Sequence, residues 1–340
     1  MKKILSIIVP AYNVDKYLDN CLASLCIPDI MDKIEVLVID DGSTDNTAVI
    51  AEKYVGEYPN SFFLFRKQNG GHGSALNLGI KYASAKYIKI VDGDDWVSKD
   101  GFIYLVSFLE NCSSDMVVTN YTWFDAQTGK IKTDIIQIMQ IMYEKEYHFE
   151  QIRELFLIKM HSMTVKTALL KENNIKIDEH CFYVDMEYIL YPVPYINTIT
   201  FLNRSVYMYR VGLTSQSVNI QNMVSRTREH SYVLSQLLDF YHQMRAPLCK
   251  TQKLKYIEFG VAKMAVSQIK IFLFSPLSNQ TFRELKVFDK DMCKNHPEIA
   301  KQMNHLVIKM LRYSFYIMYY PIAMLCIVRS FLYTLKSKGN

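Results

Sequence analysis

Residues 34–45 read IEVLVIDDGSTD, an apolar run that ends in a loop of acidic and small polar residues. The β-branched run 34–39 is typical of a strand buried on both faces, as in a parallel sheet. Gly42 favours a turn, and Ser43 or Thr44 can cap a helix that we expect over 44–57. This order of strand, acidic loop and helix indicates an α/β domain of the nucleotide-binding kind.

The same alternation extends to both sides of this stretch. Apolar runs at 5–9, 62–65 and 87–91 predict three further strands, and helical patterns occupy 14–25 and 74–83. The predicted fold is therefore α/β, with a Rossmann-like, mainly parallel sheet covered by helices. Ligands of such sheets bind beyond the carboxyl ends of the strands, so we expect the chemistry in the loops that follow the strands.

The rest of the chain becomes increasingly helical. A further strand is expected at 115–123, mixed short elements follow to about residue 217, and long helical patterns occupy 224–244 and 251–274. We expect one domain over 1–220, made of a nucleotide-binding half (1–122) and an acceptor half (123–220), then a helical region over 221–298 and a basic aromatic helical tail over 299–340.

Composition limits the class of protein. Of the 340 residues, 50% are hydrophobic and 21% are charged, which excludes an intrinsically disordered chain. The net charge of +5 is that of an ordinary surface, and we expect no nucleic-acid partner. Seven scattered cysteines without a CxxC pair indicate a reduced, cytoplasmic protein.

The tail contains an uncharged run of 16 residues, 313–328, which Pro321 interrupts. A membrane span needs about 20 apolar residues, so the run is short for that role. Aromatic residues beside basic ones suit a helix that lies on an anionic membrane surface, and packing on the catalytic domain is the alternative. The flanking basic residues are Lys301, Lys309, Arg312, Arg329, Lys336 and Lys338.

Asp92 and Asp94 follow the apolar run 87–91, two residues apart. Strand alternation would send both carboxylates to the same side of the chain. Mg²⁺ and Mn²⁺ prefer oxygen ligands and are usually held by one or two carboxylates together with substrate phosphates. The pair therefore predicts a divalent-cation site completed by a nucleotide diphosphate, with Asp94 as the metal ligand and Asp92 or Asp95 as alternatives. A solvated surface turn is the competing interpretation.

Asp40 and Asp41 stand side by side at the end of the second predicted strand. Their mutual repulsion would be relieved by a ligand donor such as a base N–H, and we choose Asp41 for that contact. Asp45 is expected only to complement the dipole of the following helix.

Gly70, Gly71 and Gly73 surround His72 in the loop after the third strand. The dinucleotide fingerprint G-x-G-x-x-G is not met, because Leu76 stands at its third glycine position and the loop does not follow the first strand. Glycine still allows backbone amides to approach phosphate or sugar oxygens, so we expect this loop beside a nucleotide. His72 is either a contact to that nucleotide or a surface residue.

Asp185 and Glu187 interrupt an apolar, aromatic stretch over 181–195. A buried acid in a cleft is a general-base candidate, and the pattern does not separate these two acids from each other or from ordinary helix-start carboxylates. Arg210 ends the aromatic run 206–209, where it would clamp a diphosphate or form a structural ion pair.

Four motifs in this order resemble those of family 2 glycosyltransferases with the GT-A fold: SIIVPAYN at 6–13, VIDDGSTD at 38–45, a glycine loop that ends in ALNLG at 75–79, and VDGDDW at 91–96. A weaker similarity, from 167–171 through Asp185 to Arg210, resembles bacterial members that decorate teichoic acid or build capsular polysaccharide. The resemblance implies an inverting, metal-dependent transferase that moves a hexose or N-acetylhexosamine from a UDP-sugar to a saccharide or lipid-linked acceptor. It further implies a role in cell-surface polysaccharide synthesis at the inner face of the cell membrane.

The resemblance also implies roles for individual residues. Pro10, Tyr12 and Asp41 would hold the uracil, and Asp92 would bind the ribose or sugar. Asp94 would bind Mn²⁺ or Mg²⁺, and Asp185 would be the catalytic base. The residues expected at the nucleotide sugar are Pro10, Ala11, Tyr12, Asn13, Asp41, Asn69, Gly71, His72, Gly73, Asn77, Asp92, Gly93, Asp94 and Arg210.

Two departures from the family pattern concern the donor sugar and the base. Many members have Ala-Arg-Asn where this chain has Ala75-Leu76-Asn77, and Glu often precedes the base where this chain has Val184. A non-catalytic nucleotide-sugar-binding or scaffold protein is the alternative function, and it would have no need of an acid at position 185. A dinucleotide oxidoreductase would require the glycine fingerprint after the first strand.

Overall fold

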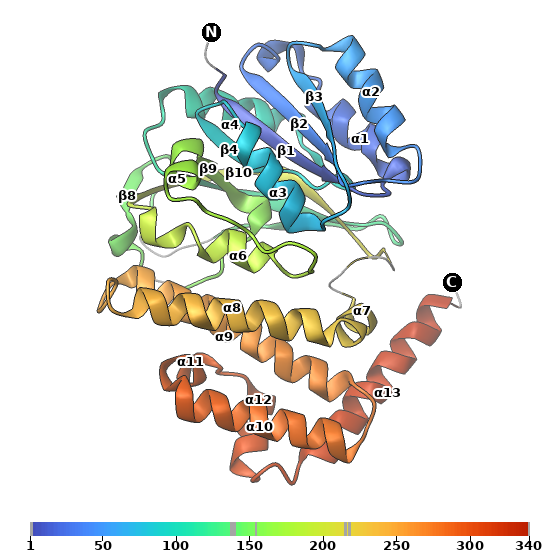
Figure 1. Ribbon diagram of the computed structural model, residues 1–340, viewed down its shortest axis with the longest axis vertical. Helices are drawn as coiled ribbons and strands as arrows, with labels where there is room; N and C mark the ends of the chain where they lie inside the picture. Colours follow the sequence, from blue (N-terminus) through green and yellow to red (C-terminus); the bar gives the residue numbers. More distant parts are fainter. Residues whose placement is uncertain (1–2, 137–140, 154, 214–215, 217–218, 339–340) are drawn as a thin grey trace. The chain divides into compact units, whose positions relative to one another are not determined.

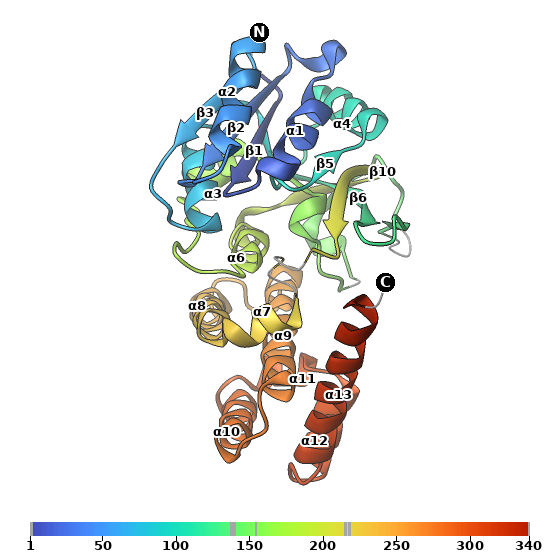
Figure 2. The same ribbon diagram turned by 90° about the vertical axis from the view of Figure 1, so that its right-hand side faces the viewer.

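The computed structural model describes residues 3–136, 141–153, 155–213, 216 and 219–338, with side chains described as far as residue 329. The chain divides into two compact units, Met1–Thr214 with Thr251–Lys253, and Ser215–Lys250 with Leu254–Asn340 (Figure 1, Figure 2). The first unit is built on a β-sheet, and the second is helical.

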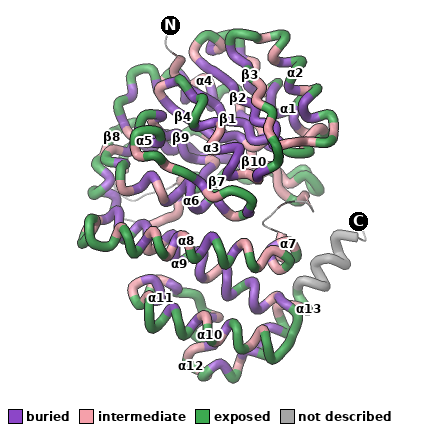
Figure 3. The backbone as a smooth tube through the Cα atoms, in the orientation of Figure 1, coloured by how far each residue is buried: buried purple, intermediate pink, exposed green. Residues whose placement is uncertain are grey.

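Four parallel strands form the first half of the sheet: β1 (Leu5–Ala11), β2 (Ile34–Asp40), β3 (Phe62–Arg66) and β4 (Tyr87–Ile90). Their spatial order is β3-β2-β1-β4. The strands β1, β2 and β4 are buried along their whole length, as their continuous apolar runs predict (Figure 3). The predicted Rossmann-like start of the chain is therefore confirmed.

Beyond β4 the sheet becomes mixed and continues in the order β9-β6-β10-β5. Strand β9 (Met163–Lys166) is antiparallel to both β4 and β6 (Met116–Asp125), and β10 (Thr198–Val211) is parallel to β6. The short β5 (Trp96–Val97) pairs antiparallel with β10, β7 (Ile131–Asp134) pairs with β6, and β8 (Glu146–His148) pairs with β10. The long strand β10 thus runs beside the segment that follows β4.

The helices of the first unit are α1 (Asp15–Leu25), α2 (Thr47–Glu57), α3 (His72–Tyr82), α4 (Lys99–Asn111), α5 (Thr167–Glu172) and α6 (Asp185–Leu190), with short 3₁₀ helices η1 (Pro28–Ile30), η2 (Phe149–Gln151), η3 (Met160–Ser162) and η4 (Val193–Tyr195). Helices α1 and α4 share a core with Leu5, Ile7 and Val9 of β1. Helix α3 packs against Ile8 instead, on the opposite face, because strand side chains alternate. A Cβ atom at Gly79 would overlap with the Ile8 side chain, so glycine permits this close approach.

The second unit contains α7 (Ile220–Ser225), α8 (Thr227–Arg245), α9 (Gln252–Phe274, whose first two residues belong to the first unit), α10 (Asn279–Asn295), α11 (Pro297–Gln302), α12 (Leu306–Tyr313) and α13 (Tyr319–Lys338). The helix predicted over 224–244 is instead two helices that meet at Arg226. The uncharged run 313–328 is divided by a turn, and Pro321 lies in the first turn of α13, where its missing N–H is not needed. Within the described residues, no helix combines the length and apolar character needed to cross a bilayer.

Lys89 of β4 is fully buried and joins the two halves of the sheet. The pairing of β4 with β9 covers Tyr87 and Ile88, and the Lys89 Nζ continues it by donating to the carbonyl oxygens of His161 (2.7 Å) and Met163 (3.3 Å). Burial lowers the pKa of Lys89 to about 7, because the charged form is poorly solvated there.

We expect Lys89→Met to change how stability depends on pH. The unfolded chain holds Lys89 protonated up to about 10.5, whereas the folded chain releases this proton near pH 7, so the Lys89 contribution to the free energy of unfolding rises between these values. The melting temperature of Lys89→Met relative to wild type should therefore fall as pH rises from 7 towards 10. Thermal melts at both ends of that range test this, and a difference that does not vary with pH would contradict it.

Candidate nucleotide-sugar site

The loop after β4 carries three acids, and Asp95 is the buried one, with 1% of its surface exposed. Its Oδ1 accepts a hydrogen bond from the Arg210 backbone N (2.7 Å), and its Oδ2 lies 2.5 Å from the Tyr207 hydroxyl. Burial, followed by the charges of Asp94 and Asp92, raises the pKa of Asp95 well above its usual range. Both carboxylate oxygens of Asp95 are therefore hydrogen-bonded to β10. This disfavours Asp95 as the alternative metal ligand to Asp94.

Asp92 and Asp94 are the two acids of this loop that remain partly open to solvent. Burial raises the pKa of each to about 6, and for Asp94 the neighbouring charge of Asp92 is the next cause. The Tyr207 hydroxyl also donates towards Asp92 Oδ2 (3.1 Å). Two crowded carboxylates with raised pKa values are stabilised by a cation, so their oxygens fit a hard divalent ion. Among the described residues, no group of three or more His, Cys, Asp or Glu side chains forms a complete metal site.

Gly93, between these two acids, packs the loop onto the end of β1. Its N–H donates to the Pro10 carbonyl oxygen (3.2 Å), and a Cβ atom at Gly93 would lie 3.1 Å from that oxygen and from Val14 Cγ2. Pro10 and Ala11 are buried strand residues, and Tyr12, just beyond them, is half exposed.

Asn13 joins the loop after β1 to the loop after β2. Its backbone adopts a positive φ of 52°, its Oδ1 accepts from the Thr44 N–H (2.8 Å), and its own N–H donates to Ser43 Oγ (3.0 Å). The side chain of Asn13 therefore holds the second loop in place beside the exposed Tyr12.

The Asp41 carboxylate holds the glycine loop by accepting hydrogen bonds from its backbone. Its Oδ1 accepts from Lys67 Nζ (2.7 Å) and the Gly70 N–H (3.0 Å), and its Oδ2 accepts from the Gly71 N–H (2.7 Å). The Asn69 side chain donates to the Asp41 carbonyl oxygen (3.0 Å). The repulsion expected between Asp40 and Asp41 is thus relieved by protein donors, and Lys67 is a partner that the sequence did not reveal.

A segment far along the chain lies over this loop, and we call residues 177–181 the strap. The His180 N–H donates to the Gly70 carbonyl oxygen (2.5 Å), and a Cβ atom at Gly73 would overlap with the Asp178 carbonyl oxygen. Asn77 exchanges two hydrogen bonds with the Ile177 backbone (2.8 and 2.9 Å) and donates to Glu179 Oε1 (3.0 Å). Gly73 and Asn77 therefore hold the strap. Both N–H groups of the Asn77 amide are used there, so the expected contact of Asn77 with the nucleotide is not supported.

His72, the first residue of α3, lies between the acids. Its Nδ1 is 3.9 Å from Asp92 Oδ1, and its Nε2 is buried without a hydrogen-bond partner among the described residues. Burial lowers the pKa of His72, while the charges of Asp185, Asp94 and Asp41 oppose that shift. Acids from the loops after β2 and β4 and from the start of α6 thus act on one imidazole.

The structure separates the two base candidates on α6. Glu187 is fully buried, its Oε2 accepts from the Asp178 N–H of the strap (2.8 Å), and burial raises its pKa to about 8. Asp185 is exposed, yet the surrounding protein still raises the pKa of its carboxyl by desolvation, against the charges of Lys159 and His72. Glu187 therefore holds the strap, and Asp185 is the acid that a ligand can reach.

Arg210 supports the acidic loop from β10. Its Nε donates to the Asp94 carbonyl oxygen (2.8 Å), and its guanidinium lies 4.7 Å from the Trp96 ring centre and 5.0 Å from that of Tyr17. Its cation is thereby held next to Asp94.

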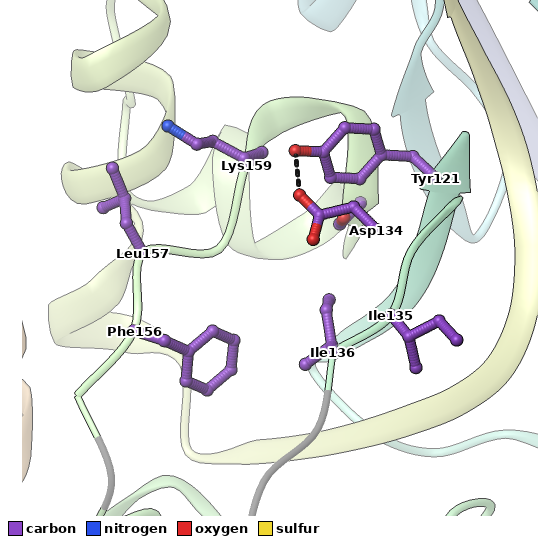
Figure 4. Close-up of a pocket in the computed structure, with 8 residues that line it drawn as sticks. Tyr121, Asp134, Ile135, Ile136, Phe156, Leu157 and Lys159 are labelled. Carbon is purple, nitrogen blue, oxygen red and sulfur yellow. Dashed lines mark hydrogen bonds between the residues drawn. The ribbon is translucent and has the colours of Figure 1, made fainter. Parts of the chain in front are cut away.

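A cavity of about 240 Å³ lies beside η3, which packs against α6. Figure 4 shows Phe156 and Ile136 on opposite sides of it, below the hydrogen bond from the Tyr121 hydroxyl to Asp134 Oδ2 (2.6 Å). Lys159, whose charge acts on Asp185, also lines the cavity. An aromatic and apolar wall with one cation and one acid suits a polar organic ligand, and no sequence motif had pointed to it.

A mixed sheet of this topology, with an acidic loop after β4 and a second acid facing it, defines the GT-A class of sugar transferases. Residues 6–176 match the model of glycosyl transferase family 2, half of the chain, and the chain belongs to that family. Both the predicted family and the predicted fold class are confirmed.

Several relatives are named for cell-surface polymers. The chain is 33% identical over 183 residues to the minor teichoic acid biosynthesis protein GgaB of Bacillus subtilis, covering 52% of this chain and 19% of the relative. It is 27% identical over 224 residues to glycosyltransferase GlyA of Streptococcus pneumoniae, covering 63% and 31%. The chain thus spans less than a third of these two relatives. Among solved structures, S. aureus TarS 1–349 in complex with UDP-GlcNAc matches with a TM-score of 0.56 at 22% identity, covering 85% of this chain and 81% of that one, which is a likeness of fold.

We expect Asp41→Asn to destabilise the protein by about 1–3 kcal/mol, because an amide cannot replace a carboxylate that accepts from one ammonium and two backbone N–H groups. Urea unfolding measures this change. Asp29→Asn, at an exposed acid outside the site, is the matched control and should stay close to wild type. Equal midpoints for the two variants would show that Asp41 does not hold the glycine loop.

Proposed function

We propose that this chain transfers a hexose or N-acetylhexosamine, with inversion, from a UDP-sugar to a saccharide or lipid-linked acceptor in cell-surface polysaccharide synthesis. The observation that carries the proposal is the convergence of Asp92, Asp94 and Asp185 on His72. The names of the relatives support the choice of polymer, and the TarS complex with UDP-GlcNAc supports a uridine nucleotide.

The donor is proposed to bind where the loops after β1, β2 and β3 meet. Tyr12 offers a half-exposed ring for a base. Pro10 and Ala11 precede it at the end of β1, and Asn13 and Asp41 lie in the loops after β1 and β2. Asn69, Gly71, His72, Gly93 and Arg210 are proposed to contact the remainder of the nucleotide sugar, towards Asp92 and Asp94. This arrangement follows the rule that nucleotides bind beyond the carboxyl ends of parallel strands.

A divalent cation, Mn²⁺ or Mg²⁺, is proposed to be held by Asp94 with Asp92 in support. When bound, it would supply charge neutralisation for the departing diphosphate. The chain's own contribution at this point is the Arg210 cation, held beside Asp94 by its stacking on Trp96 and Tyr17.

Asp185 is proposed as the general base. It would accept the proton of the acceptor hydroxyl while that oxygen bonds to the anomeric carbon and the bond from that carbon to the diphosphate oxygen breaks. A single displacement of this kind inverts the anomeric configuration. The raised pKa of Asp185 makes it a stronger base than a solvated aspartate, and its exposure leaves it reachable by an acceptor. The cavity lined by Lys159 and Tyr121 is where we place part of that acceptor.

We place the reaction in the cytoplasm, at the inner face of the cell membrane. The seven cysteines are free thiols, as suits a reducing compartment.

We expect Asp185→Asn to lower the turnover by roughly 10²–10⁴-fold, the usual contribution of a positioned general base, while donor binding persists. Release of UDP from UDP-GlcNAc, UDP-glucose and UDP-galactose measures turnover, and the donor-induced shift in melting temperature measures binding. Glu172→Gln, an exposed acid on α5, is the control. Unchanged turnover in Asp185→Asn would exclude this base. Donor binding without any turnover in wild type would favour the non-catalytic scaffold.

We expect donor binding to require a divalent cation and to weaken below about pH 6. Protons compete with the metal for Asp92 and Asp94, whose pKa values are raised to about 6, so both carboxylates are free for a cation only above that value. The melting-temperature shift by UDP-sugar with Mn²⁺ should therefore be larger at pH 7.5 than at pH 5.5, and EDTA or Asp94→Asn should abolish it. A shift of equal size with EDTA would rule out the metal site.

A further inference from the structure

The second unit exposes a concentrated set of large apolar side chains around the turn between α12 and α13. Tyr313, Phe315 and Ile317 are 83%, 83% and 78% exposed, and we call these three residues the tip. Exposed apolar residues continue into both flanking helices at Leu306, Met310, Tyr320, Met324, Leu325 and Val328. Single exposed apolar residues are ordinary, whereas a contiguous group marks an interaction surface.

The turn is built so that the tip points outward. Between the exposed residues, Tyr316 is buried, and its hydroxyl donates to Asp289 Oδ2 of α10 (2.8 Å). Arg312 donates to the same carboxylate through Nη2 (2.7 Å). Phe315 and Tyr316 both adopt positive φ angles, 51° and 69°, which bulky residues rarely do. A buried anchor and a strained backbone therefore hold aromatic side chains in water.

Helix α13 extends this apolar surface along one side. Tyr320, Met324 and Val328 recur every four residues and are exposed, while Tyr319 and Ala323 are buried. Residues four apart lie above one another on a helix, so the exposed side of α13 is itself an apolar stripe.

The charged side chains of this C-terminal segment are all basic. Residues 299–340 contain six Lys or Arg and no Asp or Glu. Arg312 is committed to Asp289, but Lys309 on α12 and Arg329 on α13 are exposed beside the apolar residues. A second copy of the chain would bring like charges together, which disfavours self-association. An anionic lipid surface complements both the charge and the aromatic side chains.

We propose that the tip inserts into the interfacial region of an anionic bilayer, with Lys309 and Arg329 at the lipid headgroups. This inference deepens the proposed function by naming the surface at which the enzyme would meet its acceptor. It rests on the proposed function only for the claim that an acceptor is present there. Membrane binding itself needs neither donor nor turnover.

Co-sedimentation of the full chain with vesicles tests the proposal, using phosphatidylcholine alone and phosphatidylcholine with phosphatidylglycerol. Wild type should bind the anionic vesicles, and added salt should weaken binding. The tip variant Tyr313→Ser/Phe315→Asn/Ile317→Ser should partition roughly tenfold or more weakly. Asn tolerates the positive φ at 315, so this variant keeps its turn. Lys309→Glu should weaken binding by roughly fivefold or more on anionic vesicles only.

The matched control removes three exposed apolar residues elsewhere, as Val49→Ser/Leu277→Ser/Val287→Ser, and should bind like wild type. No binding by wild type, or equal binding by wild type and the tip variant, overturns the proposal. Sedimentation velocity adds a further outcome, because a wild-type oligomer that the tip variant disperses, without vesicle binding, identifies a self-interface instead. The shift in melting temperature caused by the UDP-sugar is measured on the same protein. Loss of that shift would contradict the proposed function, whereas loss of vesicle binding would contradict only the membrane proposal.

Discussion

Crowding of negative charge after β4 is the constraint on which the site depends. Three acids fall within four residues, and they cannot all be ionised and buried without partners. Two donors of β10, the Tyr207 hydroxyl and the Arg210 backbone N–H, bind the Asp95 carboxylate. The negative charge that is left for a ligand is therefore that of Asp92 and Asp94. The mixed half of the sheet, through β10, therefore supplies the partners of an acid in the loop that follows its parallel half.

A second chain of contacts runs from Asp41 to the proposed base. Asp41 holds the amides of Gly70 and Gly71, Gly70 accepts from the strap at His180, and the strap donates to Glu187 on α6. Each link is a hydrogen bond to backbone, so it depends little on surface side-chain motion. Asp185 begins the same helix, and its position is consequently tied to the loop proposed to carry the donor. The raised pKa of Glu187, to about 8, favours a neutral acid at this buried joint, which avoids a second unpaired charge near Asp185.

The elements that could be predicted from sequence are those set by local patterns. Strands β1 to β4 are continuous apolar runs, so the fold of this part could be predicted, and the acids that follow the strands can be identified in the sequence as site candidates. The roles of individual site residues depend on burial, which local patterns do not reveal. Nothing in the spacing of Asp185 and Glu187 says that one is exposed and the other fully buried, since that depends on a strap contact with no motif. The partner of Asn77 is equally hidden from sequence, because the segment to which its amide donates is 100 residues away.

Positive charge is unevenly distributed along the chain. Six of the 39 basic residues and none of the 34 acidic ones fall after residue 298, so the first 298 residues carry 33 basic against 34 acidic side chains. The excess positive charge of the protein is thus a property of its tail and not of the sheet that carries the site. Asp289, which accepts a hydrogen bond from Tyr316 at the turn, is buried and already paired with Arg312, so it does not offset the exposed cations at the surface. The unit that carries the site, residues 1–214 with 251–253, has 22 basic against 27 acidic side chains. An anionic surface would therefore attract the basic tail and repel the unit that carries the carboxylates of the site.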